Sequence, residues 1–193
     1  MKKLLAFCLT VLLFASCGTP NRQSQSLADD NQLSVTQERL RAQGWKFVIP
    51  KGGEMGEEYG IVPKYGTQDN YFDIQVGDGY DVVVKIVDIA TDRCVRCVYV
   101  PQNKIVTINE IPQGRYYLKL AYGRAWMELT TDDGKIGKFT QNVLFERSYS
   151  AYDFGKKNSQ EVINYILKLN VVNGLAENNF RTEEISEEEF MKN

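Results

Sequence analysis

Short runs of alternating apolar and polar residues, separated by turn residues, fill the chain from residue 72 onward and constrain its fold more than any other feature. The runs are rich in β-branched and aromatic residues, which favour strands over helices. They lie at 72–76, 82–87, 94–100, 104–109, 115–122 and 126–130, with further runs at 143–147, 151–155 and 162–172. Strands that recur about every 8 to 12 residues with turns between them are typical of a β-sandwich. We therefore predict an all-β fold, an antiparallel β-sandwich domain over residues 72–193.

Period-two alternation also predicts which side chains of these strands face the core. In the last long run, Tyr165, Leu167, Leu169 and Val171 share one face. The stretch Tyr122-Gly123-Arg124 separates the runs at 115–122 and 126–130 and is predicted as one of the turns between strands.

Four aromatic residues in this part of the chain allow two interpretations. They are Tyr116, Tyr117, Tyr122 and Trp126, and side chains of this kind stack on sugars in glycan-binding proteins. Tyr116 and Tyr122, however, share a period-two face with Leu118 and Leu120, as core residues of a sandwich do. We favour a place in the core or at its edge, with the sugar platform as the alternative.

Composition limits the chemistry available to the chain. The 193 residues suit one domain with its own core, and a net charge of -2 lacks the basic excess of nucleic-acid binders. The chain has no histidine, which excludes His-based triads, HExxH zinc sites and the commonest general base. We expect no nucleic-acid partner, no cofactor, no metal and no catalytic residue, and therefore a protein that is not an enzyme.

The N-terminus predicts export. Lys2 and Lys3 precede an apolar run at 4–15, which spans about 18 Å as a helix and is too short for the ~30 Å hydrocarbon core of a membrane. A cleavable leader over residues 1–16 fits this pattern better than a permanent transmembrane helix.

The end of the leader, Phe14-Ala15-Ser16-Cys17, resembles the lipobox of bacterial lipoproteins. The resemblance implies that the Cys17 thiol carries a diacylglycerol and its amine a further acyl chain such as palmitate, which together anchor the protein permanently. It also implies a cell-envelope location. Gly18 stands where many inner-membrane lipoproteins have Asp, so the outer membrane is favoured. An ordinary signal peptide with an incidental cysteine is the alternative.

Residues 17–71 are predicted to link this anchor to the β domain. Residues 17–33 are polar and read as the lipidated N-terminus and a flexible tether. Ser34 and Gln37 form a capping box before a short helix at 35–43, and Gly44 supplies its end. Trp45, Phe47 and Ile49 then alternate with polar or smaller residues, which predicts a half-buried strand that ends before residue 50.

The segment at 50–70 is rich in glycine and has weak periodicity, so it is either a mobile surface connection or a binding loop. Tyr59, Tyr65 and Tyr71 are the natural contact residues of such a loop, and the alternative interpretation places at least one of them in the core. The block at 34–71 therefore holds a short helix, a strand and a glycine-rich loop.

The stretches VVVKIVDIATDRCVRCVYV and TINEIPQGRYYLKLAYG resemble transthyretin-like (prealbumin-like) or carboxypeptidase-regulatory-like β-sandwich domains. The shared elements are a strand, an Asp-containing turn, a second strand and a Pro-x-Gly-x-Tyr corner, here Pro112 to Tyr116, with Asp92 in place of a turn glycine. Over residues 72–190 the chain looks like an uncharacterised bacterial envelope domain of that kind. The resemblance implies an architecture and no chemistry.

Cys94 and Cys97 form a CxxC spacing within a predicted strand. Zinc would need further ligands that the chain lacks, and strand positions three apart lie on opposite faces about 10 Å apart, too far for a disulfide without a bulge. Free thiols used for packing are the favoured interpretation. A bulged disulfide, and redox or intermolecular pairing, stay open.

Two acidic groups, at 132–133 and 183–189, are predicted to be a turn and a solvated face, with calcium binding as the alternative. In the second group Ser186 and Glu189 indicate a short capped helical segment, and Ile185 and Phe190 could pin it to the sandwich.

These features together predict a non-catalytic, lipid-anchored envelope protein that contacts the membrane through its covalent lipid and binds or scaffolds an unknown envelope protein. A surface lipoprotein that binds a glycan or small ligand is the alternative, and an enzyme that uses carboxylates or lysines is a third hypothesis.

Overall fold

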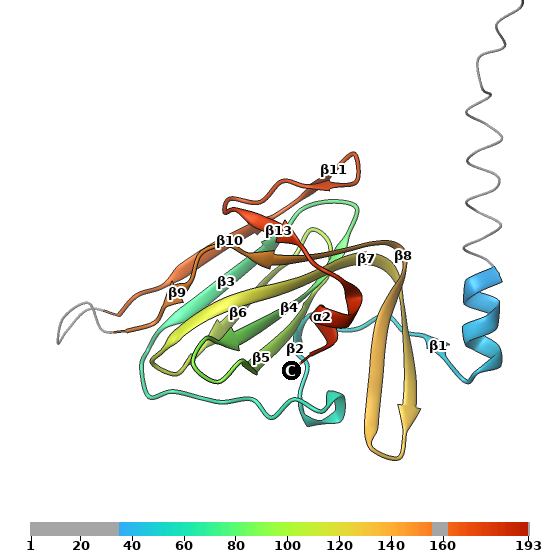
Figure 1. The fold of residues 1–193 in the computed structure, drawn as a ribbon, viewed down its shortest axis with the longest axis horizontal. Helices are drawn as coiled ribbons and strands as arrows, with labels where there is room; N and C mark the ends of the chain where they lie inside the picture. The colour runs from blue at the N-terminus through green and yellow to red at the C-terminus, as the bar shows by residue number, and fades with distance from the viewer. Residues whose placement is uncertain (1–34, 156–161, 193) are drawn as a thin grey trace, which may run out of the picture.

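The computed structural model describes residues 35–155 and 162–192, and its fold is mostly β, with antiparallel sheets and short helices toward both ends (Figure 1). Residues 35–42 are helical, and two short helices follow later, the 3₁₀ helix η1 (Glu57–Tyr59) and α2 (Glu187–Met191). The strands are β1 (Lys46–Phe47), β2 (Gly53–Glu54), β3 (Tyr71–Val76), β4 (Asp81–Asp88), β5 (Arg93–Val100), β6 (Ile105–Asn109), β7 (Arg115–Thr131), β8 (Gly134–Ser148), β9 (Tyr152–Asp153), β10 (Tyr165–Leu169), β11 (Val171–Val172), β12 (Leu175–Ala176) and β13 (Thr182–Glu184).

The larger sheet is built around β7 and is antiparallel throughout. Its strand order is β13-β8-β7-β4-β5-β2, and β1 and β9 also pair with β7. Figure 1 shows that the far halves of β7 and β8 continue as a long hairpin beyond the body of the sheet. One half of the β7–β8 pair therefore belongs to the larger sheet, and the other half forms a hairpin that borders a face of this sheet.

The smaller sheet has the order β10-β3-β6, and one of its pairings differs from the antiparallel expectation. β6 is antiparallel to β3, but β10 is parallel to it, with Leu167 opposite Ile74. The parallel pair joins residues about ninety positions apart in the sequence. Parallel strands are not connected by a hairpin turn, so no local turn signal predicts this pairing.

The main core lies between the two sheets. Val82, Val84 and Ile86 of β4 belong to one buried cluster with Phe72 and Ile74 of β3. Further members confirm the alternation read from the sequence; they include Tyr116, Leu118, Leu120, Tyr122, Leu167 and Leu169.

The outer face of the larger sheet, which faces away from the smaller sheet, is also buried. A second cluster there includes Val83 of β4, Cys97 of β5, Trp126 of the hairpin, Ile61 and the α2 residue Phe190. Alternation along β4 therefore separates two cores, and the six residues at 82–87 are all buried. The segment before residue 62 and the C-terminal helix α2 pack on this second core and shield it from solvent.

The predicted turn at 122–124 is wrong, because β7 is one strand that runs through it. The register with β8 shifts between Tyr122 and Arg124, and Ala125 adopts a φ of 53°, so the chain makes a bulge and continues. A Cβ added at Gly123 would overlap the side chain of Phe139 on β8. The glycine is needed for close approach of a neighbouring ring, which the sequence alone does not distinguish from a turn.

The N-terminal elements differ in detail from the prediction. The helix at 35–42 is confirmed, whereas its proposed cap Ser34 lies outside the described residues. The expected strand at 45–49 shortens to β1, and the predicted burial is reversed at its last two residues: Val48 packs against the outer cluster while Ile49 is 96% exposed. The backbone N–H of Val48 donates to the carbonyl of Trp126 on the hairpin, so this segment lies along the hairpin and not in the inner core.

The predicted C-terminal helical segment is confirmed. The Ser186 hydroxyl caps α2 by accepting a hydrogen bond of 3.1 Å from the backbone N–H of Glu189. Phe190 is buried and Ile185 packs against the same outer cluster, while Glu187 and Glu188 face solvent.

Two turns carry local signals that the sequence contains. The Asp88 carboxylate accepts hydrogen bonds from the backbone N–H groups of Ala90 and Thr91, and Asp92 takes the left-handed conformation with a φ of 52°. At the next corner the Tyr116 hydroxyl donates to the carbonyl of Pro112 at 2.9 Å. Side-chain chemistry thus closes both turns.

Candidate functional site

Two adjoining hollows on the outer face of the larger sheet share Met55, Tyr59 and Lys135, and we call this surface the Tyr59 groove. One hollow is an apolar cavity of about 110 Å³. Its lining includes Met55, Ile61, Val83, Lys85, Cys97, Trp126 and Phe190. The other is a more polar cleft of about 260 Å³. Its lining includes Ile49, Lys51, Glu54, Glu58, Tyr99 and Glu128.

Tyr59 stands between the hollows and is fixed by a carboxylate on β7. Its hydroxyl donates to Glu128 Oε1 at 2.5 Å, and the indole Nε1–H of Trp126 donates to the same oxygen at 2.9 Å. Lys135 Nζ lies 5.6 Å from the centroid of the Tyr59 ring. Burial, and then the hydrogen bond to Glu128, raise the pKa of Tyr59 well above its usual value. At neutral pH this tyrosine is a neutral donor.

The floor of the apolar cavity contains a buried lysine that holds the C-terminal helix. Lys85 Nζ donates to the backbone carbonyl of Phe190 at 3.0 Å and lies 4.9 Å from the centroid of its ring. Lys119, directly opposite Lys85 on β7, donates to the carbonyls of Glu189 at 2.8 Å and Lys192 at 3.0 Å. Burial lowers the pKa of both lysines.

The carbonyl groups near the end of α2 carry the negative pole of the helix, so two ammonium groups beneath them are favourably placed. This arrangement explains how a helix of only five residues stays on the sheet. It also means that both lysines donate to backbone carbonyl groups of the C-terminal segment.

Of the tyrosines predicted to form a binding loop, only Tyr59 lines the groove cavities. Tyr65 is 58% exposed, its hydroxyl donates to Glu54 Oε2 at 3.1 Å, and its ring lies 4.4 Å from the guanidinium carbon of Arg96. Tyr71 is on β3, in the smaller sheet. The three side chains thus have separate neighbours and form no common platform in the described structure.

The loop that carries them is hydrogen-bonded to the sheets along much of its length. Backbone N–H groups of Met55 and Lys64 donate to carbonyls of β5, at 2.8 and 2.9 Å. The side chain of Asn70 donates to the carbonyl of Ile111 and accepts from its N–H. Arg96, whose side chain is 3% exposed, pairs with Glu54 beneath Tyr65. Tyr59 is therefore presented by a segment with fixed neighbours.

Cys94 and Cys97 are free thiols in the structure, half-buried and buried respectively. Both belong to the outer cluster, which differs from the expectation that they lie on opposite faces of a strand. Burial raises the pKa of both thiols, so both are protonated at neutral pH. Cys17, the predicted lipidation residue, lies outside the described residues.

The other sequence candidates occupy structural positions. Trp126 is 5% exposed, and Tyr116 and Tyr122 are in the inner core, so these rings form no sugar platform on the surface. Asp132 and Asp133 make the exposed turn between β7 and β8. Within residues 35–155 and 162–192, no group of three or more His, Cys, Asp or Glu is placed to hold a metal ion. No helix in those ranges is long and apolar enough to cross a membrane.

Sequence reasoning missed Lys85, Glu128 and Phe190 as parts of one site. Lys85 did leave a signal, since it is the one charged residue within the apolar run at 82–87 and would be unusual on a solvent-free face without a partner. Glu128 left none, because its contact with Tyr59 joins residues 69 positions apart.

Comparison of the sequence with protein-family models and curated proteins, and of the structure with solved structures, gave no match. What the groove can do must therefore be argued from its chemistry. It offers an apolar cavity beside a cleft that carries carboxylates and ammonium groups, with a fixed neutral tyrosine between them. This combination suits noncovalent binding.

The Glu128 carboxylate should stabilise the groove as a hydrogen-bond acceptor. Glu128→Leu leaves the buried indole N–H of Trp126 and the Tyr59 hydroxyl without their acceptor, and should lower the free energy of unfolding by about 1–3 kcal/mol. Glu128→Gln keeps an amide oxygen in place and should cost less. Urea unfolding followed by tryptophan fluorescence measures both, and equal costs for the two variants would refute the assignment.

Proposed function

We propose that the chain is a non-catalytic, lipid-anchored protein of the bacterial cell envelope, and that its transthyretin-like β-sandwich body binds a protein partner through the Tyr59 groove. The observation that carries the binding proposal is the apolar cavity of about 110 Å³ that adjoins a charged cleft at Tyr59. Sites that bind specifically combine an apolar hollow with a few fixed polar groups.

The size of the cavity favours a small apolar group as its occupant. Apolar cavities of about 150 Å³ accept a benzene molecule, so a slightly smaller one suits a single aliphatic side chain. The cleft is lined by two acidic and two basic residues, Glu54, Glu58, Lys51 and Lys135, which supply charges of both signs. A polypeptide segment with one inserted aliphatic residue and polar neighbours matches this surface.

The proposal of a lipid anchor rests on the leader and on Cys17. The lipobox-like Phe14-Ala15-Ser16-Cys17 would place the acyl chains at the first mature residue. The polar segment at 18–32 would then separate the lipid from the β body, with a reach of about 20 Å for a flexible chain of that length. Gly18 at the following position favours the outer membrane.

A glycan or small polar ligand is the second candidate. It is favoured by Tyr65, a residue that is 58% exposed and whose hydroxyl is held by Glu54. An exposed ring with a fixed orientation is suited to stack on a sugar.

Membrane attachment should depend on Cys17. Cys17→Ala removes the thiol that would carry the diacylglycerol, so the protein should move from the detergent phase to the aqueous phase in a Triton X-114 partition. Cys8→Ala changes a cysteine within the leader and should leave the partition unchanged. Intact-mass measurement of the wild type should show the added acyl mass, and an unmodified Cys17 in membrane-derived protein would contradict the anchor.

Partner contact should be confined to the groove. A photo-crosslinking residue in place of Ile49, which is 96% exposed and lines the cleft, should capture the partner in intact cells. The same residue in place of Ile105, 61% exposed on β6 of the smaller sheet, is the matched control and should capture much less. Equal capture at both positions, or capture at Ile105 alone, would place the binding surface elsewhere, and capture of a glycan in place of a protein would favour the second candidate.

A further inference from the structure

A β-bulge in β5 brings Cys94 and Cys97 to the same face of the larger sheet. Cys97 is opposite Lys85 and Cys94 is opposite Val87, but the register shifts between Ile86 and Val87. Three residue steps on β5 therefore match two steps on β4. Because residues two apart on a regular strand point the same way, both sulfur atoms belong to the outer face, as their shared cluster shows.

The same register sets the distance between the two cysteines. Residues two apart on an extended strand are separated by about 6.6 Å, so the partners of Lys85 and Val87 on β5 are separated by about the same length. Disulfides join α-carbons that are about 4.4–6.8 Å apart. Without the bulge the spacing would be about 10 Å. The bulge thus brings the two α-carbons to the upper end of that range, and bond formation must still draw together the two Cβ atoms, which disulfides hold about 3.5–4.5 Å apart.

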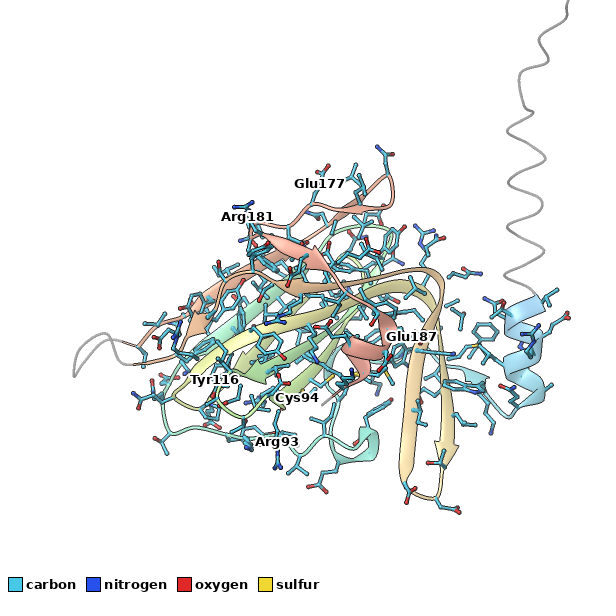
Figure 2. All side chains as sticks on the ribbon, in the orientation of Figure 1. Arg93, Cys94, Tyr116, Glu177, Arg181 and Glu187 are labelled. Carbon is cyan, nitrogen blue, oxygen red and sulfur yellow. The ribbon has the colours of Figure 1, made fainter. Side chains whose placement is uncertain are left out.

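The surroundings of the two thiols differ and give each a separate role. Cys94 is partly exposed, near the start of β5 where Figure 2 labels it, and its thiol donates to the carbonyl of Arg96 at 3.2 Å. Cys97 is 2% exposed and its sulfur lies 3.9 Å from that of Met55. The thiols also lie close enough to interact electrostatically, since Cys94 contributes to the raised pKa of Cys97. An external reagent reaches Cys94 first.

We propose that Cys94 and Cys97 are the site of an intramolecular disulfide, formed by exchange with an external disulfide. The Cys94 thiolate attacks one sulfur of the external disulfide, which forms a mixed disulfide and releases one thiol. The Cys97 thiolate then attacks the Cys94 sulfur, which closes the protein disulfide and releases the second thiol. The two cysteines lose two protons and two electrons in total, and the external disulfide is reduced to two thiols.

Formation of this bond would change the lining of the apolar cavity in the Tyr59 groove. Cys97 lines the apolar cavity beside Lys85, and its contact with Met55 would be exchanged for a bond to Cys94. Because both thiols are protonated at neutral pH, the reaction should accelerate as the pH rises. The proposal concerns chemistry of the sheet itself and stands whether or not the groove binds a partner.

The reduced full-length protein, kept in detergent, tests the proposal when it is incubated with oxidised glutathione at pH 8.5. After the remaining thiols are blocked with N-ethylmaleimide, trypsin cuts behind Arg93, Arg96 and Lys104 and separates the two cysteines into peptides 94–96 and 97–104. We expect these two peptides to be recovered joined by a disulfide. Tryptophan fluorescence recorded before the block should show that the protein is still folded.

Two single substitutions serve as matched controls. Cys97→Ser should keep glutathione on Cys94, because the second thiol that would displace it is gone. Cys94→Ser should leave the buried Cys97 unmodified on the same time scale. Three results would overturn the proposal: both cysteines alkylated in the folded wild type, glutathione retained on Cys94 of the folded wild type with Cys97 alkylated, or joined peptides that appear only after the wild type is unfolded in urea.

Discussion

Burial of β4 on both faces is the constraint on which the rest of the structure depends. Val82, Val84 and Ile86 point into the core shared with the smaller sheet, while Val83 and Lys85 point to the opposite side and are also buried. A sheet that buries apolar residues on both faces needs a cover on each. The smaller sheet covers one face. The segment at 48–61, the β7–β8 hairpin and α2 together cover the other, and the Tyr59 groove is the hollow that these covers leave between them.

Lys85 and Lys119 show how this outer cover is held. A buried ammonium group must find acceptors, and here the carbonyls of α2 supply them to both lysines. The same helix adds the apolar contact of Phe190, whose ring centroid lies 5.3 Å from that of Phe145 on β8. Hydrogen bonds from the two lysines and the ring contact of Phe190 thus hold α2 on the sheet together. The groove depends on this short helix, because Phe190 forms part of its wall.

Much of the local structure could be predicted because its signals are local. Alternation located the strands, and Ser186 with Glu189 announced the terminal helix. The parallel pairing of β10 with β3 and the continuation of β7 through Gly123 could not be predicted, since each depends on residues distant in sequence. The candidate site divides in the same way. A glycine-rich segment drew attention to Tyr59, but its partner Glu128 is set by tertiary packing, as is the bulge that brings Cys94 and Cys97 to one face.

Hydrogen–deuterium exchange of the Phe190→Ala variant tests most directly whether the outer face is a separate core held by α2. The substitution removes the ring over Lys85 and leaves the smaller sheet untouched. The account predicts faster exchange for amides of the outer cover, including that of Met55, which donates to the carbonyl of Cys97, while amides of β3 and β6 keep their protection. Equal loss of protection in both sheets, or no change at Met55, would contradict it.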